Sequence, residues 1–153
     1  MRVGLVFVGC LTAHVIAAGL LTSPWWVPDL TLIGLVLVVI RAPQRWVIFS
    51  IVAGLSTAAW AIRSSSPVFL SYLLIGWMTQ RIAKQWNAMD LHVQWLLVGV
   101  ASTALTFGFI WLDDLWSWPV VGLGLMRTVF TALSVPIVRS LMVKAVGPAP
   151  FRA

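Results

Sequence analysis

The chain has 153 residues, of which 61% are hydrophobic and 9% are charged. This composition excludes an ordinary water-soluble domain, because too few charged side chains remain to cover its surface. The net charge of +6 does not indicate nucleic-acid binding either, since the basic residues stand singly or in pairs between apolar blocks. We therefore expect a membrane protein that binds no nucleic acid.

Six apolar blocks predict an all-α bundle of about six transmembrane helices, because a helix satisfies its own backbone hydrogen bonds in lipid. The expected spans cover residues 3–21, 27–40, 46–62, 67–80, 91–112 and 119–138 of a single membrane domain. The second and fourth blocks hold only about 11 and 12 strongly apolar residues, little over half of what the hydrocarbon layer requires. Each therefore lengthens into its polar flank, tilts little or lies where neighbouring protein thins the bilayer, and the competing interpretation is a re-entrant loop. Residues 146–153 are expected to be a disordered tail.

Small residues recur at a spacing of four in the first and third blocks. They are Gly9, Ala13 and Ala17, then Ser50, Gly54 and Ala58. Such strips let helices approach closely, either within the chain or against the helix of a partner. His14, also in the first block, is expected to be a packed residue bonded to a neighbouring carbonyl group, and Cys10 a small core residue.

The basic residues orient the predicted spans, because short cytoplasmic loops are enriched in Lys and Arg. If the N-terminus is cytoplasmic, eight basic residues lie in cytoplasmic segments and only Arg63 lies in an outer loop, which favours six spans with both ends inside. The eight are Arg2, Arg41, Arg45, Arg81, Lys84, Arg139, Lys144 and Arg152. The loop from Thr79 to Asp90 is expected to lie on the inner leaflet and to attract anionic membrane lipids.

The outer loops combine acidic and indole side chains. They hold Asp29, Asp113 and Asp114 together with Trp25, Trp26, Trp116 and Trp118. Indole rings prefer the depth of the lipid headgroups, so this rim either anchors the protein or forms a docking surface for an extracytoplasmic partner.

Arg127 lies within the sixth block, about 10 Å below its outer boundary, where a charged side chain costs at least about 2.5–3.5 kcal/mol. Either its stem carries the charge to the headgroups, or the cation meets a polar group on another span, such as Asp29, or on a partner protein.

Catalysis or metal binding would require nucleophiles, bases or ligands gathered in one place. The chain has only four acidic residues and two histidines, and His14 and His92 are expected at different depths. We therefore expect a protein that is not an enzyme and that holds no cofactor or metal.

The order of features resembles the rod shape-determining MreD family. Pro28, Asp29 and Leu30 enter a short helix, a basic turn follows from Arg41 to Arg45 around Pro43, and the third span carries the pair Gly54-Leu55. A polar turn, a short fourth span and a basic exit at Arg81 and Lys84 come next. The chain departs from the family at Ser56 and Thr57, where members often carry an acidic residue, and in its turn before the fourth span, which lacks the family's glycines.

The resemblance implies a non-enzymatic inner-membrane subunit of the bacterial elongation (rod) complex, which supports cell shape and peptidoglycan synthesis. Such a protein binds the single-span partner MreC and acts through it on cell-wall synthases and cytoskeletal MreB. The family is also similar in fold to the substrate-binding subunits of energy-coupling-factor vitamin transporters. A small-molecule binding subunit of that type is the alternative, and the spacing of Ala13 and Ala17 resembles the strip that such subunits present to their coupling partner.

Overall fold

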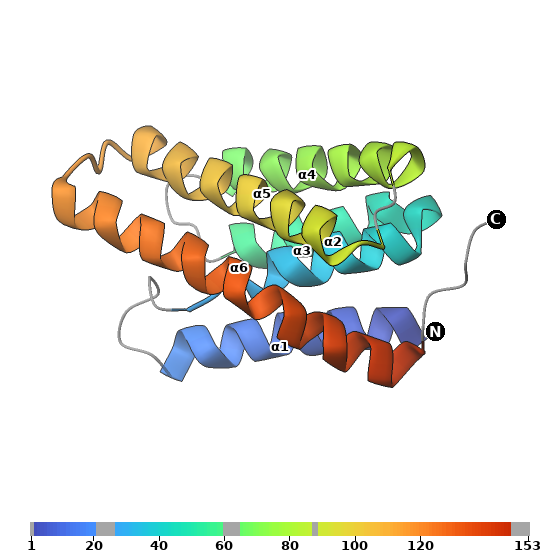
Figure 1. Cartoon of the computed structure of the whole chain (residues 1–153). Helices are drawn as coiled ribbons and strands as arrows, with labels where there is room; N and C mark the ends of the chain where they lie inside the picture. The colour runs from blue at the N-terminus through green and yellow to red at the C-terminus, as the bar shows by residue number, and fades with distance from the viewer. Residues whose placement is uncertain (1, 21–26, 60–64, 87–88, 148–153) are drawn as a thin grey trace.

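The protein folds into a bundle of six α-helices (Figure 1) in a computed structural model that describes residues 2–20, 27–59, 65–86 and 89–147. The helices are α1 (Arg2–Leu20), α2 (Leu30–Arg41), α3 (Trp46–Ala58), α4 (Ser65–Gln85), α5 (Leu91–Leu112) and α6 (Trp118–Val146). A 3-10 turn, η2 (Pro43–Arg45), joins α2 to α3, and the described residues contain no strand. The predicted all-α class is confirmed.

Three of these helices, α1, α5 and α6, are long and apolar enough to cross a membrane, and α2 is a shorter apolar helix. Their outward faces carry large apolar side chains such as Leu96 and Ile137, which are 59% and 63% exposed. In water such a surface would aggregate, whereas in lipid it is stable. The chain is therefore a membrane protein.

The short helix α2 is the centre of the bundle and contacts each of the other five helices. Ten of its 12 residues, Thr31 to Ile40, are buried. At 1.5 Å per residue it is only about 18 Å long, compared with a hydrocarbon layer of about 30 Å. Protein surrounds it on all sides, so its environment does not depend on the thickness of the bilayer.

The boundaries of the two short elements differ from the predicted ones in opposite ways. The second element begins at Leu30 and not at residue 27, because Asp29 caps the helix and the preceding residues Val27 to Asp29 are non-helical. The fourth element lengthens in both directions, into Ser65 and Gln85, and forms one continuous helix.

The last helix is longer than predicted. It passes through Pro136 and continues for ten residues to Val146, which places the first residue of the expected tail in a helix. Residues 148–153 of that tail lie outside the described residues, as do residue 21 and residues 60–62, where the first and third spans were expected to end.

Glycine permits the closest helix contacts. A Cβ atom on Gly54 of α3 would lie 2.9 Å from the Phe69 ring of α4, and one on Gly124 of α6 would lie 2.9 Å from Thr106 of α5. Ser50 and Gly54 are buried and Ala58 is half-buried, so the strip on α3 packs within the chain as expected.

The strip on α1 behaves differently. Gly9 and Ala13 are exposed, Ala17 is half-buried, and no atom lies within 4 Å of the place where a Cβ on Gly9 would be. Close packing within the chain is therefore wrong for this strip. Cys10, on the adjacent face, is half-buried and packs its Cβ against Gly34 of α2, as expected for a small core residue.

The two ends of the bundle differ in charge. The start of α1 and the end of α6 lie at one end (Figure 1), and there Arg41 donates a hydrogen bond to the Gly147 carbonyl oxygen at 2.9 Å. Arg139 likewise donates to the Met89 carbonyl oxygen at 3.0 Å and joins α6 to the turn before α5. We call this the basic end. The opposite end carries Asp113 and Asp114 in the turn between α5 and α6.

Candidate functional site

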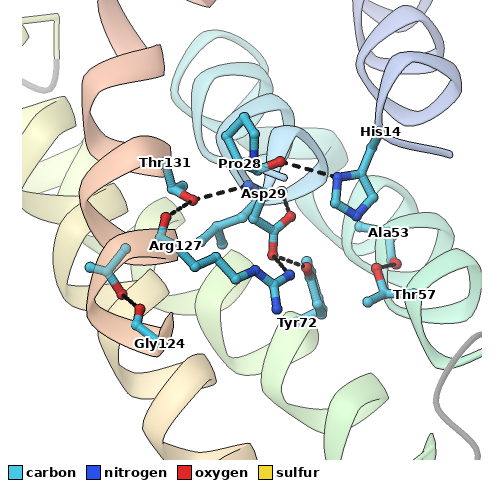
Figure 2. A network of polar contacts seen from close by, with 11 residues as sticks. His14, Pro28, Asp29, Ala53, Thr57, Tyr72, Gly124, Arg127 and Thr131 are labelled. Carbon is cyan, nitrogen blue, oxygen red and sulfur yellow. Dashed lines mark hydrogen bonds and ion pairs between the residues drawn. The ribbon is translucent and has the colours of Figure 1, made fainter. Parts of the chain in front are cut away.

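A cluster of polar side chains lies inside the bundle, at the point where α2 begins (Figure 2). Its members Tyr72 and Arg127 are seven and nine residues after the first residues of α4 and α6, which places them about 10 Å and 14 Å along those helices. The first turn of α2 therefore lies inside the bundle. Val27, just before the cluster, is 1% exposed, which agrees with this position.

Asp29 is the centre of the cluster, and its main chain and both carboxylate oxygens have partners. One oxygen accepts the backbone N–H of Leu32 at 2.9 Å, which caps the helix, and the other accepts the Tyr72 hydroxyl at 2.9 Å. The backbone N–H of Asp29 donates to the Thr131 hydroxyl at 3.0 Å. A carboxylate at a helix N-terminus is also stabilised by the helix dipole. These contacts join α2 to α4 and α6.

Arg127 provides the counter-charge. Its Nη2 atom lies 3.6 Å from the Asp29 oxygen that Tyr72 also contacts. The Arg127 side chain is 22% exposed and that of Asp29 is 7% exposed, so protein shields the pair from both lipid and water. The contact expected between these two residues is present, and Figure 2 shows the guanidinium group directed at the carboxylate.

Two further elements touch the cluster. The ring of His14 on α1 lies with Nδ1 3.3 Å from the Pro28 carbonyl oxygen, so its expected bond to a carbonyl group is confirmed. On α3, Thr57 lies beside the Tyr72 hydroxyl, and its own hydroxyl donates to the Ala53 carbonyl oxygen at 2.9 Å.

The cluster is built to hold helices together. The Thr131 hydroxyl donates to the Arg127 carbonyl oxygen at 2.8 Å while it accepts from Asp29, and the Tyr72 hydroxyl donates to the carboxylate. Among the described residues, no group of three or more His, Cys, Asp or Glu side chains is placed to hold a metal ion. What the geometry provides is a set of interhelical bonds that position the first turn of α2.

Among the described residues of the predicted outer rim, Asp29 belongs to this cluster, whereas Asp113, Asp114, Trp116 and Trp118 lie apart from it. Asp29 was expected in an outer loop but is a buried helix cap inside the bundle, because α2 begins next to it among the other helices. Asp113 and Asp114 form the turn between α5 and α6, where Asp114 has a positive φ of 52°. Trp116 and Trp118 follow and are 58% and 89% exposed. Trp25 and Trp26 lie outside the described residues.

Sequence reasoning missed Tyr72 and Thr131. The signals were present, because Tyr72 is the only tyrosine of the chain and lies in an apolar block. Thr131 is four residues after Arg127 and therefore on the same face of the helix. A hydroxyl group one turn from a membrane-embedded arginine is placed to bond to the same polar segment that the arginine contacts.

Comparison of this chain with models of protein families, with curated proteins and with solved structures finds no match.

Proposed function

We propose that this chain is a non-enzymatic scaffold subunit of the bacterial cell-elongation complex, of the MreD kind, in the inner membrane. In this role it binds an MreC-like single-span protein and, through that partner, supports cell-wall synthases, MreB and rod shape. The proposal combines the resemblance, which includes Pro28, Asp29 and Leu30, with the geometry of the polar cluster that these residues enter.

The observation that carries the proposal is that the polar groups of the cluster bond to one another and to the main chain. A solute pocket presents convergent polar groups to a cavity. Here the Asp29 carboxylate bonds to Leu32 and Tyr72 and faces Arg127, and Thr131 bonds to the main chain on either side. These groups are used to fix the central helix. A rigid bundle with a fixed central helix is what a scaffold needs, and this favours the scaffold over a vitamin-binding subunit.

We further propose that all six helices cross the membrane with both ends in the cytoplasm. The charge difference between the ends supports this orientation, because Arg41, Arg139 and Lys144 lie at the end where α6 finishes. Single cysteines at Asp114 and Lys84, in a Cys10→Ala background, test it in intact cells. A membrane-impermeant maleimide should label Asp114→Cys and spare Lys84→Cys, and the reverse pattern would invert the proposed topology.

The function is tested in a rod-shaped host that depends on this chain. Depletion should give round cells, and affinity purification should recover an MreC-like protein. Arg127→Leu, which leaves Asp29 without its cation, should reduce both rescue and partner capture, while Arg81→Leu on the exposed face of α4 should reduce neither. Recovery of a pair of ATPases together with a vitamin would establish the transporter alternative and reject the scaffold.

A further inference from the structure

An apolar groove with a volume of about 520 Å³ runs between α1 and α6. Its walls include Val6, Gly9 and Ala13 on α1, and Ile137, Leu141 and Ala145 on α6. The one polar residue in the lining, Ser134, already donates its hydroxyl to the Phe130 carbonyl oxygen at 2.8 Å. The groove therefore suits a hydrocarbon chain and not a polar solute.

The size of the groove matches one lipid tail. Its wall on α6 runs over the 12 residues from Ser134 to Ala145, whose 11 steps along the helix span about 16 Å, and one leaflet contributes half of a hydrocarbon layer of about 30 Å. Its volume is within the range of roughly 300–1,000 Å³ that is usual for pockets that bind small molecules. Gly9 faces open space, so the chain itself does not fill the groove.

Cations gather where the groove approaches the basic end. Arg2 precedes Val6 by four residues and so lies on the same face of α1, and Lys144 directly precedes Ala145. Arg41 donates a hydrogen bond to the carbonyl oxygen of Gly147, two residues beyond Ala145.

Three of the four acidic side chains lie away from the basic end. Asp29 is at the other end of α2, and Asp113 and Asp114 are in the opposite turn. Asp90 is at the basic end but on the turn before α5, next to Met89, and it accepts the backbone N–H of His92 at 3.1 Å. An anion beside Arg2, Arg41 and Lys144 would therefore complete the charge balance at this end of the groove.

We propose that this groove binds one anionic phospholipid from the leaflet at the basic end. One acyl chain lies between α1 and α6, and the phosphate group contacts Arg2, Arg41 and Lys144. The apolar lining selects a hydrocarbon chain and the three cations select the negative headgroup. A free phosphate ion would contact only the cations, and a partner helix would contact only the apolar lining. This site is separate from the scaffold function proposed above.

The test is lipid competition followed by native mass spectrometry of the purified full-length chain. Phosphatidylglycerol and phosphatidylcholine with identical acyl chains are supplied in equal amounts, and the bound lipids are counted. Each cation near a headgroup contributes about fivefold in binding an anionic lipid. The Arg2→Gln/Lys144→Gln double variant should therefore lower the preference for phosphatidylglycerol about 30-fold. This variant leaves the Arg41 contact to Gly147 in place. The comparison variant is Arg81→Gln/Lys84→Gln on α4, which removes two cations that can attract anionic lipid at the membrane surface but that do not line this groove, so it should lower the preference by less than Arg2→Gln/Lys144→Gln does.

The groove itself is tested with Gly9→Leu, whose side chain would occupy it, and with Ala13→Leu as a second filling variant. Both should reduce the binding of either lipid. The control is Gly122→Leu, another exposed glycine with open space before it but outside the groove.

Equal retention of both lipids by the wild-type chain, or unchanged lipid binding in both filled variants, would overturn the proposal. So would displacement of phosphatidylglycerol by excess inorganic phosphate, because that would show a headgroup site without a chain site. Loss of partner capture in Gly9→Leu with lipid binding intact would assign the groove to a helix. Lipid counting requires no partner protein, so this proposal and the scaffold function fail separately.

Discussion

The ion pair between Asp29 and Arg127 should stabilise the bundle, and a double-mutant cycle measures by how much. Asp29→Asn removes the charge and keeps the oxygen that caps the helix, while an NH2 group replaces the oxygen that faces Tyr72 and Arg127. Because the Tyr72 bond is lost in both Arg127 backgrounds, its loss cancels in the cycle, and Arg127→Met keeps an apolar stem. Exposed pairs contribute about 0.2–1 kcal/mol, whereas breaking a buried pair costs about 3–5 kcal/mol. At 3.6 Å, with Arg127 22% exposed, we expect a coupling free energy of about 2 kcal/mol, between these limits.

The assay is unfolding of the purified chain in mixed micelles by a rising fraction of sodium dodecyl sulfate, followed by circular dichroism. Each single variant should lose stability, and the double variant should lose about 2 kcal/mol less than the sum. Asp114→Asn is the matched control, because it removes an exposed carboxylate at a positive φ that asparagine also adopts readily. If the stability losses of the two single variants sum to within about 0.5 kcal/mol of the loss of the double variant, the two charges do not interact. That result would refute the role given to the pair.

Three further variants probe the contacts around α2 and between α3 and α4 in the same unfolding assay. Thr131→Val should lower the free energy of unfolding by about 1 kcal/mol, because it removes the acceptor for the buried backbone N–H of Asp29. The control Thr128→Val should lower it less, because that hydroxyl bonds within its own helix. Equal losses in the two variants would contradict the role of Thr131. Tyr72→Phe should cost about 1–2 kcal/mol, and no loss would mean that its bond to the carboxylate contributes nothing. Gly76→Ala should cost about 1–3 kcal/mol because the new methyl group would overlap the Ser50 hydroxyl, and adding Ser50→Gly should restore most of that loss.

The helices themselves could be predicted from the sequence, because hydropathy and block length are local properties. The charge rule likewise anticipated that Arg41 and Arg139 lie at one end of the bundle. Arg127 could be matched with Asp29, because a cation in a membrane requires a partner and the chain has few acidic residues.

Other features depend on which face of a helix meets protein, and apolar composition does not encode this. In a bilayer an apolar face is equally stable against lipid and against another helix. The spacing of Gly9 and Ala13 on α1 is the same as that of Ser50 and Gly54 on α3, yet only the second strip is packed. The buried position of Asp29 could not be predicted for the same reason. The helix α2 that it caps is apolar on every side, and such a sequence predicts a lipid-facing span even when protein surrounds the helix.

The short central helix also has a consequence for biogenesis. A segment of 12 residues that starts inside the bundle is too short to enter the bilayer as an independent span, and its capping carboxylate requires a cation that is synthesised almost a hundred residues later. We therefore expect α2 to reach its final position only after α6 has left the ribosome. A chain truncated before α6 should be degraded rapidly in cells, whereas co-expression of α6 as a separate fragment should prolong its lifetime.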